Sequence, residues 1–435
     1  MTDGRPAGRR PARISGFAFI LVATAVAGVA SYIVTWLVPN RIGLEHYAFF
    51  AVFWSFLYLV VGTLAGIQQE IARGTRPVGV PGLGRGGRAR NFAIVAALVV
   101  FVVIVGTAPV WVSAVFPVQG WGLVWPLAIG AASYVLVAVL SGSLYGVAAW
   151  LSLALMIVVD ALLRLAALAL VLAFTHNVVA LAWAAALPFP GALLVLWLFI
   201  RRSIVGRTQL DVGYRALTWN VLRTAIAAAA TGAMVSGFPF FLKLASGGQS
   251  ADTIGLYVLV ITLARAPLII VAMSLQSYFT VTFRDNVGTF WKVFLRLQAA
   301  VLFGGIVLAA LGWLVGPPIF DFLFPASRLQ PAGWLIGVLV LSSALMAALC
   351  ISAPAVLARS QHLVYSAGWV AGAIATIVVL FLPVDFTVRT VLALFIGPVV
   401  GLLVHGGYLV RANRRAQASA SSTAFPLNDS KDHHD

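Results

Sequence analysis

The chain has 435 residues, of which 62% are hydrophobic and only 9% charged, a composition that excludes a water-soluble globular protein of this size. The net charge of +16 does not indicate a nucleic-acid partner, because most Lys and Arg residues lie between long apolar runs and are not concentrated on one face. The single cysteine, Cys350, and the scattered histidines predict neither a disulfide framework nor a metal site, and we expect no cofactor.

Apolar runs long enough to cross a bilayer, about 20 residues each, recur along the whole chain. The first follows Arg9, Arg10 and Arg13 and is too long for the apolar part of a signal peptide, so we expect an uncleaved first span. We predict an all-α polytopic membrane protein with about twelve transmembrane helices. The expected spans lie near residues 16–38, 47–66, 92–115, 123–145, 149–174, 178–200, 225–244, 253–275, 294–315, 333–356, 364–382 and 390–410.

The distribution of Lys and Arg between the spans predicts the orientation, because cytoplasmic loops retain these residues near span ends. With the N-terminus inside, the expected outer segments contain only Arg41, Lys243, Arg328 and Arg389. This asymmetry predicts an N-in, C-in protein of the cell inner (plasma) membrane. Membrane lipids are expected partners, above all anionic headgroups near the Gly- and Arg-rich loop that contains residues 78–90.

A polar connection predicts that the chain is divided into two halves. Residues 1–201 and 225–411 would each form a six-helix bundle, 202–224 would form a cytoplasmic connection, and 412–435 a disordered cytoplasmic tail. Ile42-Gly43-Leu44, shortly before Tyr47, resembles Ile254-Gly255-Leu256 before Tyr257. An offset of about 211 residues across an even number of spans favours a parallel repeat.

Charged residues inside the expected spans are candidate functional groups, because an unpaired charge at a helix centre costs about 2.5 to 3.5 kcal/mol or more. Asp160 and Arg164 are four residues apart, so they share a helix face and can pair. Arg265 lies mid-span with no acid in the same predicted span. Either arginine could serve packing alone, or could bind a phosphate through its planar guanidinium.

Two further charged residues lie near predicted span ends. Glu70 precedes Arg73 by three residues, which favours an interfacial salt bridge and leaves a coupling role open. Lys243 ends the seventh span after Pro239, whose missing N–H favours a bend. Lys243 could snorkel to the interface or contact an anion on the outer side.

The chain resembles the multidrug/oligosaccharidyl-lipid/polysaccharide exporter superfamily, and within it the polysaccharide flippases. The segment Arg41-Ile42-Gly43-Leu44-Glu45-His46-Tyr47 is similar to the glycine-containing turn and aromatic residue that often open span two in that family. The segment from Gly66 to Arg73, which ends this span, is similar as well.

The resemblance implies a transporter, not an enzyme, that moves a polyprenyl-pyrophosphate-linked glycan by alternating access. It implies that Arg164 and Arg265 contact the substrate, that Asp160 tunes binding or couples transport to a driving force, and that spans one and seven line the cavity. The charges alone suggest Lys243 as a further, outer-side anion contact and Glu70 as a second coupling residue. Lipid-linked glycan and glycan-assembly enzymes would be the partners, with no catalytic residue in the chain.

Three alternatives stay open. A drug/cation antiporter of the same fold would favour acidic residues in its cavity, whereas Asp160 is the only mid-span acid beside two arginines. A membrane-embedded glycosyltransferase or polymerase would need positioned carboxylates, whereas Asp252, Asp321 and Asp385 are dispersed in short outer segments. Nothing in the sequence excludes a membrane scaffold without transport activity.

Overall fold

The structure is a computed structural model that describes residues 13–77, 88–204 and 208–423. Nearly all of these residues are helical, because the backbone polar groups of long apolar segments are satisfied within the helix itself. In chain order the elements are α1 (Arg13–Gly74), β1 (Thr75–Pro77), α2 (Ala89–Val115), α3 (Trp121–Gly146), α4 (Trp150–Phe174), α5 (Val178–Ala186), α6 (Pro188–Ile204), β2 (Thr208–Leu210), α7 (Tyr214–Val235), α8 (Phe238–Leu244), α9 (Ala251–Ser274), α10 (Gln276–Asp285), the 3-10 turn η1 (Val287–Thr289), α11 (Phe290–Leu323), α12 (Gly333–Leu357), α13 (His362–Leu380) and α14 (Phe386–Thr423).

The predicted fold class, an all-α polytopic membrane protein, is confirmed. Ten helices of the described chain are long and apolar enough to cross a membrane. The apolar part of α1 has 57 residues, more than twice the length of one span, and its backbone breaks at Gly43, where φ is 74° and ψ is 168°. α7 and α8 pass the same test only together, as a bent pair. With α1 counted as two candidate spans and the bent pair as one, the described residues contain twelve candidate spans, the number expected from the sequence.

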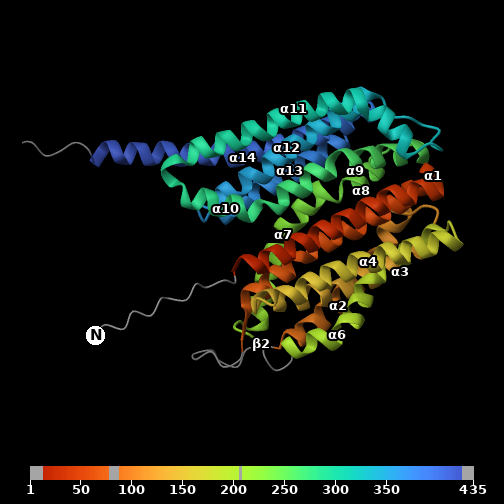
Figure 1. The fold of residues 1–435 in the computed structure, drawn as a ribbon, viewed down its shortest axis with the longest axis horizontal. Coiled ribbons are helices and arrows are strands. Elements are labelled where there is room, and N and C mark those ends of the chain that lie inside the picture. Colours follow the sequence, from red (N-terminus) through yellow and green to blue (C-terminus); the bar gives the residue numbers. More distant parts are fainter. Residues whose placement is uncertain (1–12, 78–87, 205–207, 424–435) are drawn as a thin grey trace, which may run out of the picture.

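Figure 1 shows the helices in two groups. Helices α1–α6, coloured red to yellow-green, lie below, and α8–α14, coloured green to blue, lie above, with α7 leading from one group to the other. The two groups meet where α1 packs against α7 and α9. The parallel repeat between the halves stays a prediction.

The expected connection 202–224 is largely helical, which corrects the predicted boundary. α6 continues to Ile204, and α7 begins at Tyr214 instead of near residue 225. The reason is tertiary: Leu217 and Val221 are buried in a cluster with Ile67, so this polar-looking stretch gains enough burial to form a helix.

Two short strands fasten the start of α7 to the N-terminal group. β1 pairs with β2 in antiparallel register, with Thr75 opposite Leu210. Next to the strands, the Arg76 guanidinium lies 3.3 Å from the Asp211 carboxylate. The far half of α7 belongs to the other group, because Met234 is buried in a cluster with residues of α9, α12 and α13. α7 is therefore shared between the two groups.

The C-terminal end also differs from the prediction. α14 continues through Thr423, so residues 412–423 of the expected disordered tail are helical. This stretch contains neither glycine nor proline and is rich in alanine, which favours continuation of the helix. The rest of the expected tail, residues 424–435, lies outside the described residues, as do residues 78–87 of the loop expected to contact lipid headgroups.

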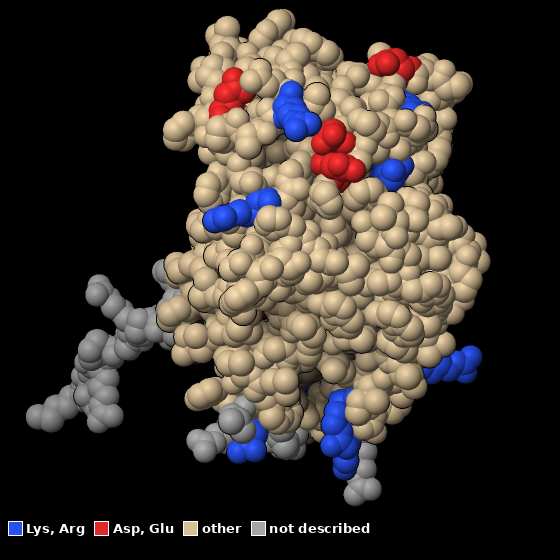
Figure 2. Space-filling view, turned by 90° about the vertical axis from the view of Figure 1, so that its right-hand side faces the viewer, with Lys and Arg blue, Asp and Glu red and all other residues tan. Residues whose placement is uncertain are grey.

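The surface of the described helices is apolar over most of its extent. Val110, Phe174 and Phe322 are more than 80% exposed, which suits contact with lipid chains and not with water. Seen from the right-hand end of Figure 1, the surface is mostly uncharged, and the acidic side chains in view lie in its upper part near a few cations (Figure 2).

Candidate functional site: a cavity between the two groups of helices

A cavity of about 540 Å³ lies where the two groups meet. Its walls come from α1, α3, α4 and α6 on one side and from α7, α8 and α9 on the other. Among the described residues that line it, only Asp160, Arg164 and Arg265 are charged. The structure thus brings the two arginines predicted to bind substrate, and one of the two predicted coupling acids, to a single space.

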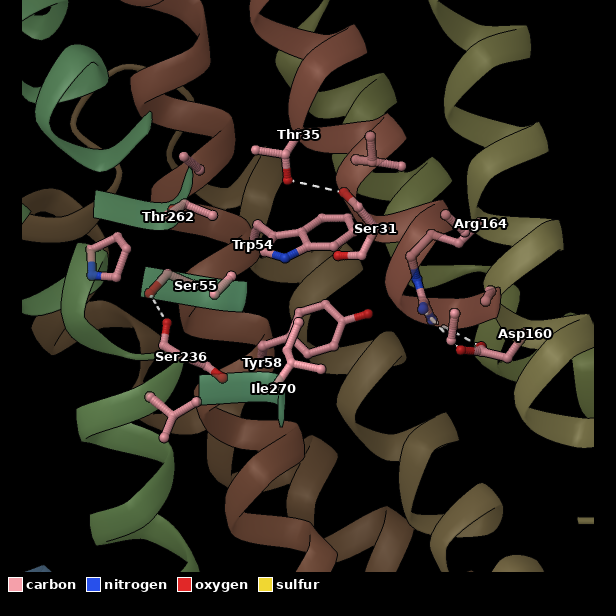
Figure 3. A pocket seen from close by; sticks show the side chains of 18 of the residues that line it. Ser31, Thr35, Trp54, Ser55, Tyr58, Asp160, Arg164, Ser236, Thr262 and Ile270 are labelled. Atoms are coloured by element: carbon pink, nitrogen blue, oxygen red, sulfur yellow. Dashed lines mark hydrogen bonds and ion pairs between the residues drawn. The ribbon is translucent and has the colours of Figure 1, made fainter. Parts of the chain in front are cut away.

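Asp160 and Arg164 form a bidentate ion pair on α4. The Arg164 Nη1 and Nη2 atoms lie 2.8 and 2.9 Å from the two carboxylate oxygens of Asp160, as the spacing of four residues allows (Figure 3). Arg164 Nε donates to the carbonyl oxygen of Ala185 at 3.1 Å, and the guanidinium lies over the Phe189 ring, 4.5 Å from its centroid. Arg164 is therefore neutralised and its fork of donors is occupied.

Arg265 on α9 has a very different environment. Only 4% of its surface is exposed, and no described acidic side chain pairs with it. Its Nη2 atom reaches the Met234 carbonyl oxygen at 3.5 Å, the outer limit of a hydrogen bond, and its Nε–H has no partner among the described residues. The guanidinium also lies over the Phe238 ring, 5.7 Å from its centroid. The cavity thus carries one uncompensated positive charge, a costly arrangement unless a ligand or water completes it.

The break between α7 and α8 forms part of the cavity wall. The pair is bent by 73°. Ser55, on the second segment of α1, donates to the Ser236 carbonyl oxygen at 2.6 Å (Figure 3). The same hydroxyl accepts from the Phe240 N–H at 3.1 Å. These two backbone groups are four residues apart and would bond to each other in a continuous helix. The hydroxyl of Ser55 is inserted in place of that bond, a recognised cause of a helix kink.

The other two predicted site residues do not line this cavity. Glu70 is 7% exposed near the end of α1, where it pairs with Arg73 at 2.9 Å and accepts from the Thr224 hydroxyl at 2.7 Å. It links α1 to α7. Lys243 lies half-buried near the end of α8 and outside the lining. The roles predicted for Glu70 and Lys243 stay predictions, and neither residue enters the site described here.

A second, apolar groove of about 780 Å³ adjoins the cavity. It runs between the first segment of α1 and α9 and reaches the end of α11. Its lining is dominated by apolar side chains, and Ile270 lines both spaces. Next to the groove, Trp36 Nε1 and Asn40 Nδ2 both donate to the carbonyl oxygen of Leu323, which joins α1 to α11.

The first segment of α1 lines the cavity, as the resemblance implied, whereas the contribution of the second segment was not predicted from the sequence. Phe50, Trp54 and Tyr58 line the cavity, and their spacing of four residues on one helix face is visible in the sequence. The role of Ser55 has no such signal, because its partners are 181 and 185 residues away in the chain.

Sequence comparison finds mycobacterial proteins that are similar to the chain, although no protein-family model matches it. A protein of Mycobacterium bovis is 31% identical over 398 residues, which cover 90% of this chain and 91% of the relative. Two proteins of Mycobacterium tuberculosis are each 30% identical, over 398 and 400 residues. The chain belongs to the family of these proteins. All three relatives are named as uncharacterized, so the family carries no assigned activity to this chain.

Comparison with solved structures shows which proteins share the fold of this chain. An inward-facing multidrug resistance MATE family transporter of the MOP superfamily matches with a TM-score of 0.61 and 17% identity, over 95% of this chain and 99% of that one. A MOP superfamily transporter from Pyrococcus furiosus, described as having a binding pocket of reverse polarity, and a MATE in complex with Br-NRF each match with a TM-score of 0.55 and 17% identity. They match over 91% of this chain and over 95% and 96% of those chains. The chain shares the fold of these membrane transporters, while its membership of the superfamily and of the polysaccharide flippase branch stays a prediction.

Proposed function

We propose that the protein translocates an anionic, lipid-linked oligosaccharide, with a polyprenyl phosphate or pyrophosphate as its carrier, across the cytoplasmic membrane. The transport would proceed by alternating access to the cavity between the two groups of helices. The observation that carries the proposal is the uncompensated charge of Arg265 inside that cavity.

The charge balance of the cavity favours an anionic substrate. Asp160 and Arg164 cancel each other, so Arg265 leaves the lining with an excess of one positive charge. A phosphate group would supply the missing negative charge and accept hydrogen bonds from the guanidinium, including its free Nε–H. Of the two arginines expected to bind substrate, Arg265 would bind the anion directly. Arg164 would do so only by displacing Asp160.

The apolar groove favours an amphiphilic substrate. A hydrocarbon chain could lie in the groove between α1 and α9 while its polar head enters the cavity, since the two spaces meet at Ile270. Such an arrangement keeps the chain in an apolar environment during the passage of the head group. A small hydrophilic anion would have no use for the groove.

The orientation predicted from Lys and Arg places loading on the cytoplasmic side. Enzymes that assemble the glycan on its lipid carrier would act on that face and are the proposed partners. No positioned carboxylate is available in the cavity for a glycosyltransferase, because Asp160 is the only acid of its described lining and is engaged with Arg164. We therefore propose a transporter instead of an enzyme.

A drug/cation antiporter is the second candidate, favoured by the similarity to a multidrug resistance MATE family transporter and to a MATE in complex with Br-NRF. A cationic drug would need Asp160, whose side chain is 24% exposed, to exchange Arg164 for the drug. The buried charge of Arg265 would oppose this exchange.

A proteoliposome assay distinguishes the two functions. The purified protein is reconstituted with a fluorescent polyprenyl-pyrophosphate-linked oligosaccharide, and the head group that becomes inaccessible to an external quencher is measured over time. We expect flipping above the rate of protein-free liposomes, reduced at least about tenfold by Arg265→Gln, a loss of about 1.4 kcal/mol. Arg265→Lys should retain part of the rate, because the charge stays but the planar fork is lost.

The matched control is Arg328→Gln, which removes an exposed arginine outside the cavity and should leave the rate unchanged. Wild-type flipping no faster than in empty liposomes would overturn the proposal. Uptake of a cationic dye against a proton or sodium gradient, lost in Asp160→Asn, would establish the antiporter in its place.

A further inference from the structure

Three aromatic residues form a continuous wall along one side of the cavity. Phe50, Trp54 and Tyr58 follow one another at intervals of four residues on the second segment of α1, so their side chains lie on the same helix face. The ring centroids of Phe50 and Trp54 are 5.6 Å apart, and those of Trp54 and Tyr58 are 5.0 Å apart. We call these three residues the aromatic wall.

The aromatic wall lies between the polar groups of the site. Figure 3 shows the rings of Trp54 and Tyr58 in the middle of the view, with Asp160 and Arg164 on one side and Ser55 and Ser236 on the other. The Trp54 side chain is only partly buried, and its indole N–H has no hydrogen-bond partner within the described part of the chain. Phe50 is 2% exposed and also packs in the core, whereas Trp54 and Tyr58 are only partly buried and border the open space of the cavity.

Apolar ring surface combined with a few unused hydrogen-bond donors and acceptors matches the chemistry of a sugar ring. A pyranose presents C–H groups on its faces and hydroxyl groups around its rim, so it needs both kinds of surface at once. The aromatic wall supplies the first. The Trp54 N–H supplies part of the second, together with the remaining lone pairs of the Asp160 carboxylate, which stays 24% exposed although both of its oxygens bond to Arg164. Phosphate alone would gain nothing from an aromatic surface.

We propose that the aromatic wall of Phe50, Trp54 and Tyr58 is a sugar-binding subsite for the head group of the transported lipid. The inference rests on the proposed function and divides its site into two parts. Arg265 binds the phosphate of the carrier, and the aromatic wall binds the sugar nearest to it. The protein thereby distinguishes a glycosylated carrier from the bare lipid phosphate, which an arginine alone cannot do.

Equilibrium binding of two ligands tests this division of roles. The full-length protein in lipid nanodiscs is titrated with a polyprenyl pyrophosphate and with the same lipid carrying a disaccharide. We expect Trp54→Leu to weaken binding of the glycosylated lipid about tenfold and of the bare lipid less than about twofold, because only sugar contacts are removed. Arg265→Gln should weaken both ligands alike. Trp54→Phe should retain most of the affinity for the glycosylated lipid, since the ring surface persists.

The matched control is Trp125→Leu on α3, where a 43% exposed tryptophan lies outside the cavity lining. If Trp54→Leu does not fold, Tyr58→Leu provides the same measurement. Equal weakening of both ligands by the wall variant, or no change in either, would overturn the sugar subsite while leaving the proposed function intact. Absence of saturable binding of either lipid to the wild-type protein would overturn the proposed function itself.

Discussion

Replacing Ser55 by alanine should partly straighten the bend between α7 and α8. The Ser55 hydroxyl bonds both to the Ser236 carbonyl oxygen and to the Phe240 N–H, the two groups that would pair in an unbroken helix. Without the hydroxyl, both groups are left buried and unpaired unless they bond to each other. That direct bond requires the helix to approach a straight path.

The magnitude follows from the bonds involved. Two neutral hydrogen bonds contribute about 1 to 3 kcal/mol net, and the direct backbone bond recovers roughly one of them in the straighter form. A bias of about 1 kcal/mol changes the ratio of bent to straight molecules about fivefold. α8 has seven residues, about 10 Å of helix, so complete removal of the 73° bend would move its far end by about 12 Å. Some bend should remain, because Pro239 has no N–H to donate to the Val235 carbonyl oxygen.

Distances between two spin labels measure this change directly. Labels at Trp219, exposed on α7, and Gln249, exposed beyond α8, would be introduced in a background in which Cys350 is replaced by alanine. We expect Ser55→Ala to add or enlarge a population at longer distance, and Ser55→Thr to resemble the wild type. Thr63→Ala is the control, since Thr63 lies on the same helix as Ser55 and its hydroxyl donates only to the Leu59 carbonyl oxygen of that helix. Identical distance distributions for Ser55→Ala and the wild type would refute the role assigned to the hydroxyl.

Two further predictions concern stability. Asp160→Asn should lower the thermal unfolding temperature in detergent, because it leaves the buried Arg164 guanidinium without its counter-ion. The double substitution Asp160→Asn with Arg164→Gln should recover part of this loss. Additive losses in this double-mutant cycle would contradict the pairing. Gly43→Ala should cost about 1 to 3 kcal/mol, because its φ of 74° and ψ of 168° suit glycine alone. The control is Gly106→Ala, in a helix with open space around the glycine, which should be neutral or stabilising in the same unfolding assay. Equal effects of Gly43→Ala and Gly106→Ala would contradict the backbone strain assigned to Gly43.

The spans and the central ion pair could be predicted from the sequence because both depend on local spacing. Apolar runs of bilayer length form helices whatever their neighbours, and residues four apart on a helix meet. The start of α7 at Tyr214 could not be predicted in this way, because its helix depends on burial of Leu217 and Val221 against a distant part of the chain.

The candidate site was predictable in its charges and not in its shape. A charge inside an apolar span indicates a cavity or a partner, and this rule found Asp160, Arg164 and Arg265. This rule cannot distinguish a cavity from the end of a helix. It therefore also selected Glu70 and Lys243, which lie outside the cavity lining. The insertion of Ser55 at the helix break depends on how two remote helices approach each other, which no local pattern encodes.

The double attachment of α7 has a mechanical consequence for the proposed transport cycle. Its first turns are fastened by the short sheet and by Thr224 to the N-terminal group, and its last turns are buried in the C-terminal group. In the proposed cycle, a rotation of one group against the other would deform this helix, so we expect a transmembrane segment and not a loop to be the elastic element. The stretch 225–229 between the two attachments, alanine except for Ile226, is where we expect that torsion to be absorbed.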